Sequence, residues 1–404
     1  MSRLSCGLCL LAGLLFSVWP TPSTSIDSTQ FWLKIRASDK FQRSVIADTG
    51  VAIQWIKDDY VIAIGNLQEK KELEKLGWVE FSSSVAEIKD FPSKDSEFHN
   101  YTELTASLND LQKKYPQLVS LSSIGSTVQG REILALRISG HLDQGAQMPA
   151  ILFMGGHHAR EHLSVEIPLR ILEWMLEEYS KGNERIRRLI DSREIHLIPA
   201  VNPDGLEYDI ASGRYQMWRK NRTQNRDGTF GVDLNRNYSY GWGTGGSSRD
   251  PDSETYMGTA PFSEPETRAI KKYIEDHQNI STLLSFHTFS ELILYPWGGK
   301  YDPISDQRDR NVHITMANKM AEWNGYVAEQ TSELYIASGD TTDWAFGEHK
   351  IISFTFELDP SSSRGGGGFY PGPDVIPVVV NKNKEPMLYL IEYADNPYRV
   401  LDAN

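Results

Sequence analysis

The spacing of hydrophobic and polar residues divides the chain into a short N-terminal region and a longer C-terminal one. In the short region, residues 26–89, the apolar residues Phe31, Leu33 and Ile35 recur at every second position, which is typical of a strand with one buried face. The charged segment 68–78 carries leucines among lysines and glutamates and contains a glycine stop, which predicts a surface helix. We therefore expect residues 26–89 to form a small α+β unit.

The longer region follows a polar stretch without periodicity, KDFPSKDSEFHN at residues 89–100. After it, short apolar segments alternate with amphipathic segments that have the period of a helix. Strand-like segments begin at residues 151, 194, 282 and 351, and helical ones at 165, 263, 316 and 385. This alternation predicts an α/β domain over residues 90–404, with a mixed, largely parallel sheet sandwiched by helices.

The first 25 residues have the composition of a targeting segment. Arg3 precedes an apolar run at residues 6–19, and small residues follow up to Ser25. A membrane anchor is the weaker interpretation, because roughly 18 to 20 apolar residues are needed to span a bilayer. We expect a cleaved signal peptide over residues 1–25 and a secreted protein that is not retained in a membrane. Both cysteines lie in the apolar run, so the mature chain is expected to lack disulfides.

The charge balance narrows the possible partners. The chain has 41 Lys and Arg against 54 Asp and Glu, a formal net charge of -13. Nucleic-acid binding needs clustered Lys and Arg, because phosphate contacts supply most of its affinity. We therefore expect no nucleic-acid partner.

The pattern GGHHAREH at residues 155–162, directly after a predicted strand, is a candidate metal site. His158 and Glu161 are three residues apart, so in a helical turn or a tight loop both side chains can face one cation. A neutral imidazole and a carboxylate suit zinc. Because an ordinary surface turn also supplies such a pair by chance, a third ligand is needed.

Two further strand ends carry polar groups that can complete the site. Active sites of open α/β sheets gather at the carboxyl ends of strands, where His287 and Glu357 are expected. Each also has a simpler interpretation: His287 as a hydrogen-bonded core histidine, and Glu357 as half of a buried ion pair. Three protein ligands leave zinc one open position, and Glu357 would then act as the general base.

Arginine and asparagine residues recur between the candidate metal ligands. Arg219 lies in WRKNR, and Asn235 and Arg236 lie in DLNRNY together with Asp233. A guanidinium group binds carboxylates in a bidentate manner, and asparagine adds a neutral donor. Most basic residues on loops are merely solvated. Their recurrence here favours recognition of an anion.

Together these motifs resemble those of zinc carboxypeptidases of the A/B family, in particular the bacterial carboxypeptidase T group. The resemblance extends over residues 90–404. It rests on the motifs HHAREHL, NPDG, WRKNR, DLNRNY, SETYMG, FHTFSELILYP, LYIASGDTTDW and SFTFEL. It implies one zinc ion per chain and hydrolysis of the last peptide bond of peptides and proteins, which releases single amino acids.

The resemblance implies a role for each matching residue of the metal centre. The zinc ligands are His158, Glu161 and His287. Asp233 orients a zinc-bound histidine, Arg219 stabilises the oxyanion and Glu357 is the catalytic base.

A second set of matching residues is implied to bind the substrate. Arg160 is electrophilic, Asn235 and Arg236 hold the terminal carboxylate, and Tyr335 closes over the bound residue. Phe289 stands where many relatives have tyrosine, which affects the outer subsites.

Substrate preference is implied by the segment after the closing tyrosine. Thr342 stands where relatives with an apolar preference have an aliphatic residue and strictly basic-preferring relatives have aspartate. Asp340 is expected to face a lysine or arginine head group, and Thr355 to form an uncharged wall on the strand face of Glu357. We expect a mixed hydrophobic and basic preference, with acidic last residues disfavoured.

The resemblance is weaker before residue 90, where it implies that residues 26–89 are an activation propeptide removed close to Lys89 by an activating protease. It also allows a structural calcium ion, for which no motif supplies ligands.

Two alternative functions are those of a deacylase or peptidoglycan-trimming relative and of a catalytically inactive binding module. The deacylase or peptidoglycan-trimming relative is expected to lack the Asn–Arg pair and the closing tyrosine. The inactive binding module is expected to lack a zinc ligand or the catalytic base. All of these residues are present in the sequence.

Overall fold

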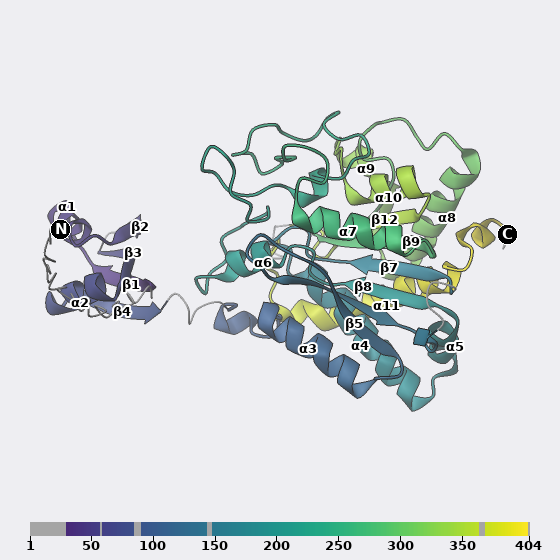
Figure 1. The fold of residues 1–404 in the computed structure, drawn as a ribbon, viewed down its shortest axis with the longest axis horizontal. Coiled ribbons are helices and arrows are strands. Elements are labelled where there is room, and N and C mark those ends of the chain that lie inside the picture. Colours follow the sequence, from purple (N-terminus) through teal and green to yellow (C-terminus); the bar gives the residue numbers. More distant parts are fainter. Residues whose placement is uncertain (1–29, 57–58, 85–89, 144–147, 363–367, 403–404) are drawn as a thin grey trace, which may run out of the picture. The chain divides into compact units, whose positions relative to one another are not determined.

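The chain forms two compact units, Met1–Ala86 and Glu87–Asn404 (Figure 1). The structure, a computed structural model, describes residues 30–56, 59–84, 90–143, 148–362 and 368–402. The predicted signal peptide and the predicted cleavage point at Lys89 lie outside these residues. Among the described helices, none combines the length and the apolar character that a membrane span requires.

The first unit is a four-stranded antiparallel sheet with two helices, in the strand order β2-β3-β1-β4. Leu33 and Ile35 pair with Ala63 and Val61 across the sheet, and all four side chains are buried, as their alternation predicts. Its elements are β1 (Gln30–Arg36), α1 (Lys40–Asp48), β2 (Ala52–Ile56), β3 (Tyr60–Asn66), α2 (Leu67–Lys75) and β4 (Val79–Ser84). The expected α+β unit is therefore present.

The second unit is built on an eight-stranded mixed sheet in the order β11-β10-β12-β9-β7-β8-β6-β5. The four central strands, β12, β9, β7 and β8, pair in parallel, and antiparallel pairs join them to the outer strands. The strands are β5 (Val119–Ser126), β6 (Glu132–Ile138), β7 (Ala150–Met154), β8 (Glu194–Ile198), β9 (Ile280–Thr288), β10 (Leu292–Tyr295), β11 (Val327–Gln330) and β12 (Ile352–Leu358). This confirms the predicted largely parallel sheet.

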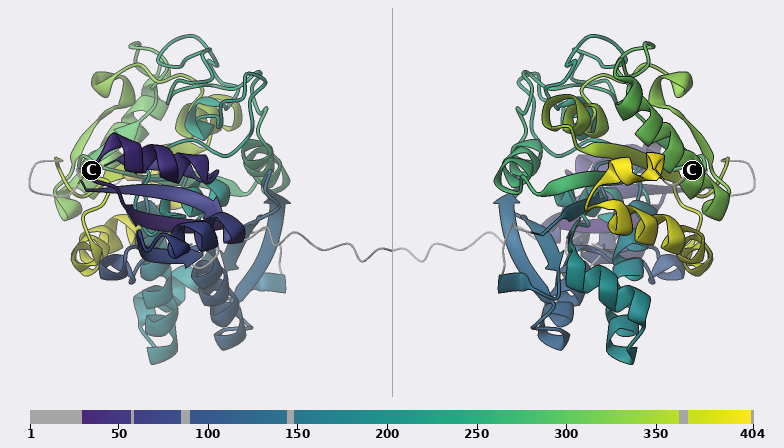
Figure 2. Two further views of the ribbon diagram at one scale, coloured as in Figure 1. Left: turned by 90° about the vertical axis from the view of Figure 1, so that its left-hand side faces the viewer. Right: turned by 90° about the vertical axis from the view of Figure 1, so that its right-hand side faces the viewer.

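Helices cover both faces of this sheet (Figures 1 and 2). In β7, Phe153 packs into one core with α4 (Leu163–Lys181) and α11 (Ile376–Tyr393). Leu152 packs into a second core with α7 (Pro265–Asp276) and α10 (Thr341–His349). Burial on both faces explains why β7 is a continuous apolar run rather than an alternating one. The helices are α3 (Tyr101–Lys114), α4 (Leu163–Lys181), α5 (Glu184–Ser192), α6 (Pro203–Ile210), α7 (Pro265–Asp276), α8 (Gln307–Asn324), α9 (Thr331–Leu334), α10 (Thr341–His349) and α11 (Ile376–Tyr393).

The parallel pairing fixes where the polar strand ends meet. Glu357 of β12 is the registered partner of His287 in β9, and Met154 of β7 is the partner of Ser285. The loop that follows β7 therefore starts at the same edge of the sheet as His287 and Glu357.

We predict that Phe153→Ala lowers the free energy of unfolding of the second unit by about 3 to 5 kcal/mol, because it leaves a cavity between the sheet and α4. Tyr301→Ala is the matched control, since this aromatic side chain of the same unit is 72% exposed. Its cost is expected to stay below about 1 kcal/mol. Denaturant unfolding of the two variants measures both values, and equal costs would contradict the position of β7 in the centre of the sheet.

Candidate metal centre and active site

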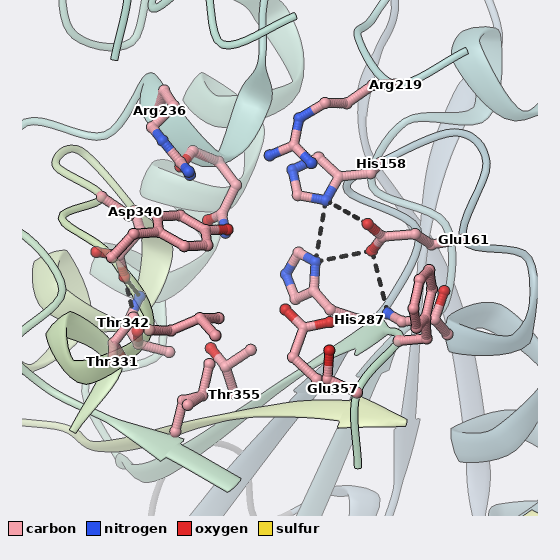
Figure 3. A pocket seen from close by; sticks show the side chains of 18 of the residues that line it. His158, Glu161, Arg219, Arg236, His287, Thr331, Asp340, Thr342, Thr355 and Glu357 are labelled. Carbon is pink, nitrogen blue, oxygen red and sulfur yellow. Dashed lines mark hydrogen bonds and ion pairs between the residues drawn. The ribbon is translucent and has the colours of Figure 1, made fainter. Parts of the chain in front are cut away.

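Three side chains converge on one point at the carboxyl ends of β7 and β9. His158 and Glu161 lie in the tight loop between β7 and α4, and His287 lies near the end of β9 (Figure 3). Glu161 Oε1 is 2.8 Å from His158 Nδ1, Glu161 Oε2 is 2.9 Å from His287 Nδ1, and the two Nδ1 atoms are 3.1 Å apart. All three residues are buried, and they are the only such group of His, Cys, Asp or Glu among the described residues.

This donor set fits zinc. Tetrahedral zinc with bonds of about 2.0 to 2.1 Å keeps its ligand atoms about 3.3 Å apart, only a few tenths of an ångström more than the distances here. Burial opposes the charge on Glu161, but the two histidines outweigh it and hold the pKa of Glu161 below its usual value, so the carboxylate stays ionised. Three protein ligands leave a fourth position open, as in a catalytic site rather than a structural one.

Gly155, the first residue of the metal loop (residues 155–162, between β7 and α4), is required by close packing. A Cβ atom on Gly155 would lie 2.1 Å from the backbone oxygen of Ser164, which no other residue could tolerate. Gly155 therefore allows the first turn of α4 to approach β7, and this approach brings Glu161 next to His158.

Asp233 connects the metal centre to Arg219. Asp233 Oδ1 is 3.1 Å from His158 Nε2, and Oδ2 accepts hydrogen bonds from Arg219 Nε at 2.9 Å and Nη2 at 2.8 Å. Burial opposes ionisation of Asp233, but Arg219 and His158 lower its pKa well below the usual value. A proton on His158 Nε2 leaves the Nδ1 lone pair for a metal. The sequence suggested the contact with His158, but not the ion pair with Arg219.

Glu357 lies beside the metal ligands, in register with His287 in the neighbouring strand. Its side chain lines a cavity of about 310 Å³ (Figure 3). Burial raises the pKa of Glu357 to about 8, although His287 acts in the opposite direction. A carboxyl group with this pKa can both accept and donate a proton near neutral pH.

The same cavity brings together nearly all of the sequence-predicted residues. Asp233 lies behind its wall, where it contacts His158 and Arg219. The predicted residues that line the cavity are His158, Arg160, Glu161, Arg219, Asn235, Arg236, His287, Phe289, Tyr335, Asp340, Thr342, Thr355 and Glu357.

Two donors at one end of the cavity are held in place through their other atoms. Asn235 Oδ1 accepts hydrogen bonds from Thr341 N at 3.0 Å and Thr341 Oγ1 at 2.9 Å, which leaves its Nδ2 for a ligand. Arg236 donates from Nε to Gly246 O at 3.0 Å and from Nη1 to Asn235 O at 2.7 Å. Tyr335, 53% exposed, lines the same cavity.

Asp340 has a structural role that the sequence analysis did not assign. It is the N-cap residue of α10: its Oδ1 accepts from Thr342 N at 2.9 Å, Thr342 Oγ1 at 2.7 Å and Asp343 N at 2.9 Å. Its Oδ2 is buried and has no hydrogen-bond partner in the described parts of the chain. Burial raises the pKa of Asp340. The pattern GDTTD, an aspartate directly before a helix, was the available indication of the cap.

Phe369 lines the cavity as well, and sequence reasoning missed it because it follows a glycine run without any polar motif. The guanidinium carbon of Arg160 lies 4.5 Å from the centre of its ring, and the ring of Phe289 is 4.9 Å away. Arg160 Nη1 also donates to Met217 O at 3.2 Å and to Glu254 Oε2 at 3.1 Å.

Comparison with known proteins gives a consistent result. The family model described as zinc carboxypeptidase matches residues 104–386. A zinc carboxypeptidase of Saccharothrix mutabilis subsp. capreolus is 36% identical over 94% of this chain and 92% of its own length. Carboxypeptidase B of Astacus astacus is 32% identical over 66% of this chain and 88% of its own length.

Solved structures share the fold. Bovine thrombin-activatable fibrinolysis inhibitor, in complex with tick carboxypeptidase inhibitor, has a TM-score of 0.65 and 26% identity over 74% of this chain and 97% of that one. Carboxypeptidase A from Helicoverpa armigera has a TM-score of 0.65 and 23% identity over 94% of this chain and 100% of that one. Because the family model matches most of the chain and the structure contains the histidine–glutamate–histidine group, the chain belongs to the zinc carboxypeptidase family.

Proposed function

We propose that this zinc carboxypeptidase releases single amino acids from the C-termini of peptides and proteins, with Glu357 as its general base. The observation that carries the proposal is a single cavity lined by the metal ligands, Glu357 and the donor pair Asn235 and Arg236. A terminal carboxylate held by this pair would position the last peptide bond beside the metal ligands, so that only the final residue fits.

The residues of the cavity divide the chemistry among them. Zinc, when bound, supplies a Lewis acid and lowers the pKa of water. Glu357 takes the proton of the attacking water and returns it to the leaving amine, a task to which a pKa raised by burial is suited. Arg219, oriented by its ion pair with Asp233, stabilises the developing oxyanion. Tyr335 closes over the bound residue.

The two alternative functions account for fewer of the cavity residues. A deacylase or a peptidoglycan-trimming enzyme leaves the pair Asn235 and Arg236 without a role. An inactive binding module leaves Glu357 as a carboxylate in an apolar strand without a function to offset the cost of its burial.

Glu357→Gln is expected to lower kcat by about a hundredfold to ten-thousandfold, because the amide cannot accept the proton of water. Its zinc content should equal that of the parent, since Glu357 is not a predicted ligand. Release of amino acids from a test peptide and metal analysis measure the two quantities. Glu322→Gln, on α8 outside the cavity, is the control and should keep full activity.

An active Glu357→Gln enzyme would remove Glu357 from the role of base. Treatment of the parent with a chelator is the companion measurement. It should abolish turnover, and added zinc should restore it.

We further propose a mixed preference for hydrophobic and basic last residues. Thr342 and Thr355 give the cavity uncharged walls, and Asp340 adds a carboxyl group whose Oδ2 is buried and has no hydrogen-bond partner among the described residues. We expect the negative charge of this carboxyl group to attract a lysine or arginine head group and to repel a terminal glutamate. One such contact is worth roughly 1.4 kcal/mol, which corresponds to a tenfold preference and not to strict selection.

Asp340→Asn is expected to lower kcat/KM for peptides ending in Arg by about tenfold, with little change for Leu. Asparagine is also a good N-cap, so α10 should persist. Because burial raises the pKa of Asp340, the carboxyl group gains its charge only as pH rises through that raised value. The Arg-to-Leu ratio of kcat/KM in the parent should therefore increase with pH, and this increase should vanish in the variant.

The control for this prediction is Asp306→Asn, which changes the equivalent cap of α8, where Asp306 Oδ1 accepts from Arg308 N and Asp309 N. It should leave the preference unchanged. Efficient release of a terminal Glu by the parent would contradict the placement of the Asp340 charge in the substrate pocket.

We also propose that the chain is secreted through residues 1–25 and made as a zymogen that an activating protease cuts close to Lys89. Burial in the second unit supports a cut upstream of Phe91, whose ring lies 4.8 Å from that of His162. Asp95 accepts a hydrogen bond from Tyr215 OH at 2.7 Å. Phe91 is 5% exposed and Asp95 1%, so both belong to the core of the catalytic unit.

Chains that begin at Asp90 and at Ser96 test this boundary. The first should be active and stable. The second lacks Phe91 and Asp95 and should unfold at a temperature lower by several degrees, since an aromatic contact and a buried hydrogen bond are lost. The chain from Ile26 should release amino acids at least about tenfold more slowly than the chain from Asp90; equal rates would refute the zymogen.

A further inference from the structure

We infer that Asp209 is a positioning residue that holds three segments of the active site in place through one buried carboxylate. The inference rests on the proposed function, because it concerns the geometry of the same metal centre. Asp209 lies in the last turn of α6 and is 0% exposed. It does not line the cavity, so it acts only through its neighbours.

The carboxylate of Asp209 accepts hydrogen bonds from three separate parts of the chain. Oδ2 is 2.9 Å from His162 Nε2, and Oδ1 accepts from Trp218 N at 2.8 Å. The hydroxyl of Tyr370 lies 3.1 Å from Oδ1 and 3.0 Å from Oδ2. A buried carboxylate is costly unless donors satisfy it, so these contacts stabilise one arrangement of the three segments against others.

Each donor is the chain neighbour of a residue in the active-site cavity. His162 follows Glu161, Trp218 precedes Arg219, and Tyr370 follows Phe369. The carboxylate of Asp209 therefore holds, through their chain neighbours, the predicted metal ligand Glu161, the predicted oxyanion-binding Arg219 and the cavity residue Phe369. Small displacements matter here, because misplacement of a catalytic group by about 1 Å can lower the rate a hundredfold.

The donors also have contacts besides those with Asp209: Trp218 Nε1, for example, donates to Asn221 O at 3.2 Å. His162 is the N-cap residue of α4, yet its side chain makes no capping hydrogen bond. The ring of Tyr370 stacks on Tyr215 with 3.7 Å between the ring centres and an interplanar angle of 12°. Tyr215 in turn donates to Asp95 at 2.7 Å. These rings support Tyr370 from one side, and Asp209, together with the backbone of Met217, holds its hydroxyl end.

Asp204 at the other end of α6 provides the comparison. It is also 0% exposed, and it accepts from Gln129 N at 2.9 Å and Arg131 Nη1 at 2.7 Å. Neither partner is adjacent to a residue of the cavity. If buried carboxylates of α6 served only to stabilise the fold, the two would be equivalent.

The test compares Asp209→Asn with Asp204→Asn in the full chain, with two readouts. The first is zinc affinity, measured by competition with a chelator. The second is kcat and KM for a peptide with a C-terminal Leu. Asp209→Asn should weaken zinc binding and lower kcat by about tenfold to a hundredfold each, as is usual for groups that orient metal ligands. KM should change less than about threefold, since Asn235 and Arg236 make no contact with Asp209.

Asp204→Asn should leave zinc affinity and kcat within about threefold of the parent, even if the substitution lowers the melting temperature. The inference is overturned if both quantities in Asp209→Asn stay within twofold of the parent, or if Asp204→Asn loses as much. Zinc affinity can be measured in a protein without enzymatic activity. If the parent protein lacked carboxypeptidase activity, the proposed function would be wrong, but the zinc-affinity comparison would still test this inference.

Tyr370→Phe keeps the test open if Asp209→Asn does not fold. It removes one hydroxyl and should lower kcat by about threefold to tenfold. Tyr398→Phe is its control, because Tyr398 OH donates to Asp309 Oδ1 at 2.6 Å on α8, outside the cavity. Equal kcat in both tyrosine variants would overturn the inference.

Discussion

The parallel pairing of β12 and β7 with β9 places Glu357 next to His287 and starts the metal loop at the same edge of the sheet. The rest of the site depends on this pairing. A shift of one residue in the register of β12 would move Glu357 to the opposite face. Burial of both faces of the central strands by helices prevents such a shift, because it would carry Phe354 and Phe356 out of their core as well.

Charge balance is the second constraint on the site. Glu161, Asp233 and Glu357 lie close together, and the first two are buried. His158 and His287 stabilise the ionised form of Glu161, and Arg219 that of Asp233. Within the described part of the chain, half-buried Glu357 has no comparable ion pair, and its removal from solvent raises its pKa. The pKa of Glu357 thus differs from those of its two neighbours, which is consistent with the proposed role of Glu357 as the group that exchanges protons.

Several residues combine a structural contact with a place at the cavity wall. Asp340 caps α10 with one oxygen and also belongs to the lining of the cavity. Asn235 anchors its oxygen on Thr341 and keeps its amide donor. Such sharing reduces the freedom of these side chains before a ligand arrives, so less conformational entropy is lost on binding.

The sequence by itself determined the two-unit organisation of apolar segments, the largely parallel sheet and the candidate metal-binding and anion-binding side chains. These follow from periodicity and from short motifs, which depend on residues close together in the chain. The roles carried over from related proteins remain predictions. The tertiary structure alone decided that Arg219 pairs with Asp233, and that the segments of His162, Trp218 and Tyr370 share Asp209. These contacts join residues far apart in sequence, where no period or spacing relates them, because only the folded chain brings their donors and acceptors within hydrogen-bond distance.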